Sequence, residues 1–71
     1  MVISETVNRL MDMLIDLDIS DDFIKAIISA AANDDNRQII INYITTKKSN
    51  NMKIDDNQLV RIAVYLGRNN K

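Results

Sequence analysis

Apolar residues recur along most of the chain at spacings of three and four, the pattern of a helix that buries one face. The first such segment runs roughly from Glu5 to Leu17, and Ser4 is placed to cap its start. Its apolar positions cover about 200° of circumference at about 100° per residue. They are Val7, Leu10, Met11, Met13, Leu14, Ile15 and Leu17.

A second helix is predicted to begin after Ser20, whose hydroxyl can cap the first turn. Ile19 and Ile24 are spaced to pack across this cap. Consecutive alanines at 30–32 present little bulk, which lets another helix approach closely, and Asn33 is the expected stop. The residues expected in the core are Phe23, Ile24, Ile27, Ile28 and Ala31.

The third segment admits two interpretations. Asp35, with Gln38 three residues later, predicts a helix that opens with a capping box. Residues 39–46, however, are rich in β-branched and aromatic side chains, a composition typical of strands. A strand over 38–46 that turns through 49–51 is therefore the alternative. We favour the helix because its cap is well formed and because the other segments offer no sheet for a strand to join.

Residues 47–53 form a polar connection to a fourth predicted helix. Ile54 and Asp55 repeat the apolar residue and the cap that open the second helix, and Leu59 is spaced to pack against Ile54. Gly67 stands where a left-handed residue commonly ends a helix. The apolar face of this helix consists of Leu59, Ile62, Ala63 and Leu66.

These segments predict one all-α domain over residues 1–71, a compact bundle of four short helices in two hairpins, with 68–71 as a frayed tail. A chain of 71 residues is near the lower size limit for independent folding. It has no cysteine, so no disulfide can support the fold. We therefore expect either very good helix packing or association with a partner.

Residues 9–46 resemble the three-helix pattern of ubiquitin-associated domains. The likeness lies in residues 23–27 and in Asn33-Asp34-Asp35 leading to Tyr43-Ile44. The resemblance implies a compact three-helix core, to which the fourth helix is added. Leu17-Asp18-Ile19 stands where that family has Met-Gly and an aromatic residue, so we take no function from the resemblance.

Groups able to do catalytic or metal chemistry are few. The chain has no histidine and no cysteine, which removes the commonest general base and the commonest zinc ligands. Residues 16–22 have the spacing that opens an EF-hand loop, but Asp21 and Ile27 occupy the positions that need Gly and Glu. We therefore predict no catalytic residue, no metal, no cofactor, no small-molecule substrate and no enzyme activity.

Membrane and secretory segments are not expected. The longest apolar runs, such as residues 39–41, are far too short to span a bilayer. Polar residues follow the first three apolar ones at once, so a secretory segment is not predicted. We expect the protein to be cytoplasmic.

The net charge of −1 hides an asymmetry, because residues 1–35 carry −6 and residues 36–71 carry +5. Acidic residues at helix starts account for part of it. The basic half supports an alternative function, a small nucleic-acid-binding regulator. We rank it second because the pI is about 5.1. Its expected contacts are Lys47, Lys48, Lys53, Arg61 and Arg68.

The first and fourth helices carry a wider apolar arc than a surface helix needs. Contacts with two neighbours in the bundle would explain this width, and so would a surface covered by another chain. Because the chain has no other means of stabilisation, we predict a protein-interaction module or small regulator. It would bind a protein partner or itself, and a homo-oligomer is expected. The expected contact residues are Met13, Ile15, Val60, Val64 and Tyr65.

Overall fold

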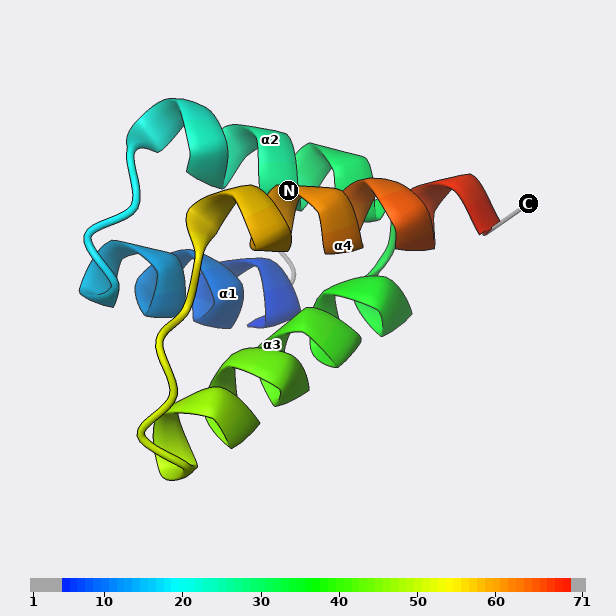
Figure 1. Cartoon of the computed structure of the whole chain (residues 1–71). Helices are drawn as coiled ribbons and strands as arrows, with labels where there is room; N and C mark the ends of the chain where they lie inside the picture. The colour runs from blue at the N-terminus through cyan, green and yellow to red at the C-terminus, as the bar shows by residue number, and fades with distance from the viewer. Residues whose placement is uncertain (1–4, 70–71) are drawn as a thin grey trace.

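The computed structural model describes residues 5–69, and its regular elements are four α-helices (Figure 1). Over this range no strand occurs, so residues 38–46 are helical and the predicted all-α bundle is confirmed. The strand alternative is wrong. The helices are α1 (Glu5–Asp16), α2 (Asp21–Ala31), α3 (Asp34–Ser49) and α4 (Asp56–Asn69).

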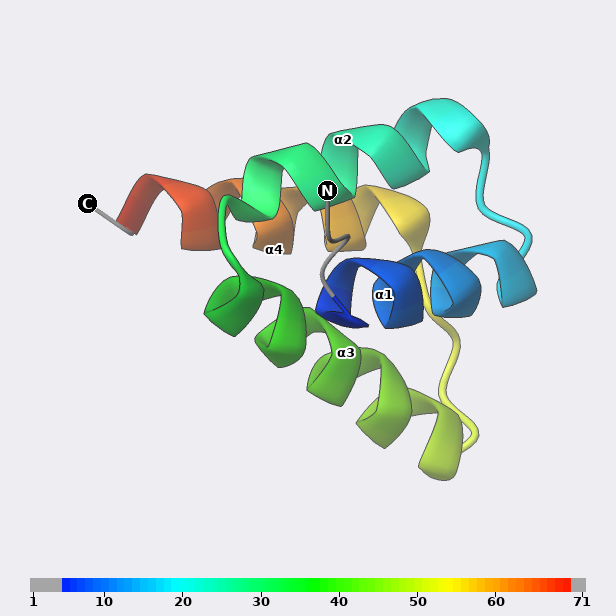
Figure 2. The ribbon, with the colours of Figure 1, turned by 180° about the vertical axis from the view of Figure 1, so that it is seen from behind.

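The chain forms two helical hairpins, α1–α2 and α3–α4, which stack on each other. Their first helices, α1 and α3, lie side by side, and so do their second helices, α2 and α4. α1 and α3 run in the same direction, because Thr6 contacts Asp34 at their N-terminal ends and Lys48 contacts Asp16 at their C-terminal ends. α2 and α4 also run parallel to each other and opposite to α1 (Figures 1 and 2). α2 approaches α3 across the middle, whereas no Cα atom of α1 lies within 8 Å of a Cα atom of α4.

The core lies where the apolar faces of all four helices meet. Each fully buried large side chain contributes about 1.5–3 kcal/mol to stability. The core residues come from every helix: Leu10, Leu14, Ile24, Ile27, Ala31, Ile40, Ile41, Ile44, Leu59 and Ala63. Half-buried Ile19 and Ile54 pack against this core, which places the predicted staple residues at its edge.

Gly67 has a different role from the one predicted. It lies inside α4 and no glycine has a positive φ, so the expected left-handed helix end is wrong. A Cβ at Gly67 would overlap the carbonyl oxygen of Ala30 in α2. The backbones of α2 and α4 therefore approach closely, as the alanines at 30–32 led us to expect.

The junction between α2 and α3 also differs from the prediction. Asn33, expected to stop the second helix, is the N-cap of α3, and its Oδ1 accepts from the amide of Asn36 at 2.9 Å. α3 therefore begins at Asp34 instead of Asp35. Because Asn33 is the N-cap, the third helical position is Asn36, so the predicted capping box between Asp35 and Gln38 is wrong. Gln38 Nε2 donates to Asn42 Oδ1 instead. The turn itself is made by Ala32, whose φ is 77°.

The remaining helix ends follow the sequence more closely. The hydroxyl of Ser20 accepts from the amide of Phe23 at 3.5 Å, and the carboxylate of Asp55 accepts from the amide of Asn57 at 3.0 Å. Ser4, the predicted cap of the first helix, lies outside the described residues. α4 continues through Asn69, so residues 68 and 69 are helical and only 70–71 of the predicted tail fall outside the description.

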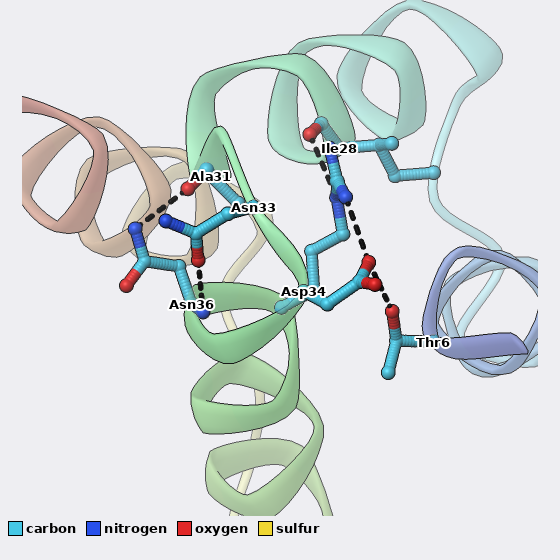
Figure 3. A network of polar contacts seen from close by, with 7 residues as sticks. Thr6, Ile28, Ala31, Asn33, Asp34 and Asn36 are labelled. Carbon is cyan, nitrogen blue, oxygen red and sulfur yellow. Dashed lines mark hydrogen bonds and ion pairs between the residues drawn. The ribbon is translucent and has the colours of Figure 1, made fainter. Parts of the chain in front are cut away.

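Asn36 is the buried polar side chain of the described core (Figure 3). Its Nδ2 donates to the carbonyl oxygens of Ala31 at 2.7 Å and Leu66 at 3.2 Å. One amide group therefore joins the end of α2, the start of α3 and the last turns of α4. Nothing in the periodicity of the sequence distinguishes Asn36 from a surface asparagine, and it was not predicted.

Candidate functional site

The five predicted interface residues fall on two helices whose backbones are not adjacent. Met13 and Ile15 lie on α1, and Val60, Val64 and Tyr65 lie on α4. Met13 and Val60 are half-buried and pack against the core. The exposed members are Ile15, Val64 and Tyr65, with 58%, 40% and 67% of their surface accessible. The candidate site therefore consists of two separate surfaces.

The exposed surface of α4, which we call the α4 face, consists of Arg61, Val64, Tyr65 and Arg68. Residues three, four and seven apart share one side of a helix, so these four side chains are neighbours. Within residues 5–69 neither guanidinium forms an ion pair. Aromatic residues and arginine are the types enriched at protein interfaces.

The α4 face combines residues that the sequence had assigned to different hypotheses. Val64 and Tyr65 were predicted protein contacts, and Arg61 and Arg68 were predicted nucleic-acid contacts. The helical spacing of these residues contained the signal. Apolar periodicity and charge distribution each identify only two of these four residues.

The exposed surface of α1, which we call the α1 face, carries charges of both signs and two apolar residues: Glu5, Asn8, Arg9, Met11, Asp12, Ile15 and Asp16. Glu5, Arg9 and Asp12 lie on the side of α1 away from the buried residues Leu10 and Leu14, whereas Met11 lies beside that buried side. Met11 was not among the predicted contacts, although it is one helical turn before Ile15. Neither Glu5 nor Asp12 forms an ion pair in the described part of the chain.

The predicted nucleic-acid contacts are spread over three parts of the chain. The ammonium of Lys47 lies over the ring of Tyr43, 5.4 Å from its centroid, and Lys48 pairs with Asp16 at 2.9 Å. Lys53 lies in the loop between α3 and α4, while Arg61 and Arg68 are on α4. The structure therefore does not gather the five into one basic cluster.

An open hollow of about 610 Å³ lies between the α1–α2 loop and the α3–α4 loop. Its wall mixes charges of both signs, because Lys48 and Lys53 share it with Asp18, Asp55 and Asp56. Apolar side chains from both loops supply the rest of the lining: Leu17, Ile19, Met52 and Ile54. The hollow has neither the uniform basic charge that suits phosphates nor a mainly apolar lining that suits small ligands.

Within residues 5–69 two further kinds of feature are absent. No three histidine, cysteine, aspartate or glutamate side chains come close enough together to hold a metal ion. None of the described helices combines the length and the apolar character needed to cross a membrane.

Comparison with known proteins yields no relative. No protein-family model, no curated protein and no solved structure matches the chain.

Proposed function

We propose that this protein is a small protein-interaction module that acts by binding a protein partner, including a second copy of itself. The observation that carries the proposal is the α4 face, where exposed Val64 and Tyr65 lie side by side between two arginines that form no ion pair within residues 5–69. Tyrosine and arginine are the residues that most often dominate binding energy at interfaces. A cytoplasmic setting is part of the proposal, supported by the absence of cysteine.

Tyr65 gives the proposal its main support. Two-thirds of the surface of Tyr65 stays accessible to water, so burial of this side chain contributes little to the stability of the fold. Its rigid ring offers much contact area at a low entropy cost, which favours use in binding. The flanking arginines are suited to a partner with carboxylate groups beside an apolar centre.

The test uses Val64→Lys and Tyr65→Ala, each alone, with Ile39→Lys as the matched control. Ile39 is 47% exposed on α3, so its substitution places a similar charge on a different surface. Sedimentation should show that the wild type self-associates, or titration should show that it binds an isolated partner. The two α4 variants should weaken that binding at least about tenfold, the usual effect of losing a dominant contact.

Circular dichroism should show that all three variants keep the wild-type helical signal. An equal loss with Ile39→Lys would contradict the proposal, because the effect would then follow from added charge and not from the α4 face. Unfolding of Val64→Lys alone would leave Tyr65→Ala to decide the question, since the tyrosine is the more exposed residue.

A further inference from the structure

The hydrophobic core is shared between the two helical hairpins. Half of its residues belong to α1 and α2, and the other half belong to α3 and α4. Backbones approach most extensively between α2 and α4 and between α1 and α3, and both pairs join one hairpin to the other. The ion pair between Asp16 and Lys48 also joins them. Each hairpin therefore depends on the other to bury its apolar side.

The connection between the hairpins consists of two residues, Ala32 and Asn33. Three described residues other than glycine have a positive φ, and two of them are Asp18 and Asn51, residue types that tolerate this conformation. The third is Ala32, whose φ of 77° and ψ of −38° lie outside the left-handed helical region. Because alanine has no polar side chain to compensate, the connection holds backbone strain.

The same connection can be helical. No glycine or proline interrupts α2, α3 or the residues between them, and three consecutive alanines, the strongest helix formers, precede Asn33. With helical angles at Ala32 and Asn33, α2 and α3 would form one continuous helix. The carbonyl of Ala31, which accepts from the side chain of Asn36, would then accept from a backbone amide four residues later. The continuous helix therefore removes the strain and keeps this carbonyl satisfied.

Opening the connection has a cost within a single molecule. Asn33 caps α3 in the closed form, and Asn36 joins α3 to Leu66 of α4 and Ala31 of α2. Opening also separates the hairpins and exposes the core that they share. An open chain is therefore favourable only when a second open chain restores the contacts between hairpins.

We infer that two copies of this protein exchange hairpins, with α2 and α3 of each copy joined into one continuous helix. The α1–α2 hairpin of one copy packs on the α3–α4 hairpin of the other, and the contacts between hairpins form again between copies. Short, strained connections favour this kind of exchange. The exchange does not use the α4 face, so it goes beyond the proposed function.

Two substitutions at the connection should shift the monomer–dimer equilibrium in opposite directions. Ala32→Gly relieves the strain of the closed form and weakens the continuous helix, so it should raise the dimer dissociation constant at least about a hundredfold. Asn33→Ala removes the cap of α3 and strengthens the continuous helix, so it should lower the constant at least about tenfold. Sedimentation up to millimolar concentration measures each constant, and circular dichroism checks that every variant is folded.

The matched control is Asp18→Gly. It places a glycine at another positive φ, in the loop within the first hairpin, where exchange changes nothing. It should change the dissociation constant by less than about threefold. An effect as large as that of Ala32→Gly would mean that the dimer does not depend on the connection, and the inference would fail.

A distance within one chain identifies the exchanged form. Asp22→Cys with Ser49→Cys, made in Asn33→Ala, gives two exposed sites for nitroxide labels in a chain with no cysteine of its own. In a continuous helix these sites are about 40 Å apart. The longest extent of the closed molecule is 33 Å. Pulsed electron paramagnetic resonance, with labelled chains diluted in unlabelled ones, should show the longer distance in the dimer and a shorter one in the monomer.

A dimer that shows only the shorter distance would overturn the inference, as would folded Asn33→Ala protein that stays monomeric at millimolar concentration. If Asn33→Ala does not fold, Asp35→Ala takes its place, because it also strengthens the continuous helix at an exposed position. A dimer that keeps the shorter distance and dissociates with Tyr65→Ala would contradict hairpin exchange and leave the proposed function standing. A dimer with the longer distance that Tyr65→Ala leaves intact supports hairpin exchange.

Discussion

The backbone of Gly67 in α4 lies against the carbonyl of Ala30 in α2 with no room for a methyl group between them. Glycine ordinarily costs a helix about 1 kcal/mol relative to alanine. Here the glycine is required by its neighbour, because only a residue without a Cβ lets the two helices approach this closely. The close approach of the last turns of α4 to α2 therefore depends on this position.

Gly67→Ala should destabilise the protein by about 1–3 kcal/mol, the usual cost of overpacking, despite the gain in helix propensity. Chemical denaturation measures the free energy of unfolding. Gln58→Ala, at an exposed position on the same helix, is the control and should change it by no more than about 0.5 kcal/mol. A more stable Gly67→Ala variant would show that α4 is free to move away from α2.

Asn36→Ala should cost about 1–3 kcal/mol of unfolding free energy, because the carbonyls of Ala31 and Leu66 lose their donor in a partly buried site. Asn36→Asp should cost at least as much, since a carboxylate would face two carbonyl oxygens. Asn42→Ala, on the exposed side of α3, is the matched control and should be nearly neutral. Thermal and urea denaturation of the three variants test this order.

Ile39 and Ile40 are adjacent and should respond very differently to truncation. Ile40 is fully buried, so Ile40→Ala should cost about 2–5 kcal/mol through lost burial and a cavity. Ile39 is 47% exposed, and Ile39→Ala should cost less than about 1 kcal/mol. Equal losses of stability, measured by denaturant titration, would mean that α3 is rotated about its axis relative to this structure.

Binding to duplex DNA should be undetectable at low salt. Nucleic-acid affinity depends on clustered cations that release counterions, whereas here Lys48 is paired with Asp16 and Lys53 lies near Asp55 and Asp56. Fluorescence anisotropy at two salt concentrations measures this. Binding that weakens steeply as salt rises would instead favour the nucleic-acid alternative, and Arg61→Glu would then be the first variant to examine.

The sequence by itself predicted four helical segments, with a strand as the alternative for the third, and it located the starts of α2 and α4. Ser20 and Asp55 predict the starts of α2 and α4, because their side chains accept hydrogen bonds from backbone amides only two or three residues away. Such local interactions are fully specified by local sequence. The apolar spacing on α1 and α4 likewise gave the buried positions Leu10, Leu14, Leu59 and Ala63.

Only the tertiary structure decided which helix surfaces stay exposed and why Gly67 and Asn36 are needed at their positions. Gly67 looks like a helix end until α2 is placed beside it, and Asn36 looks like a surface residue until two other helices surround it. The run of isoleucines at 39–41 has no preferred face until its neighbours bury two of the three. Contacts between residues distant in the chain depend on how the helices pack. Helical periodicity predicts which face of a helix is buried, but not which other helix packs against that face.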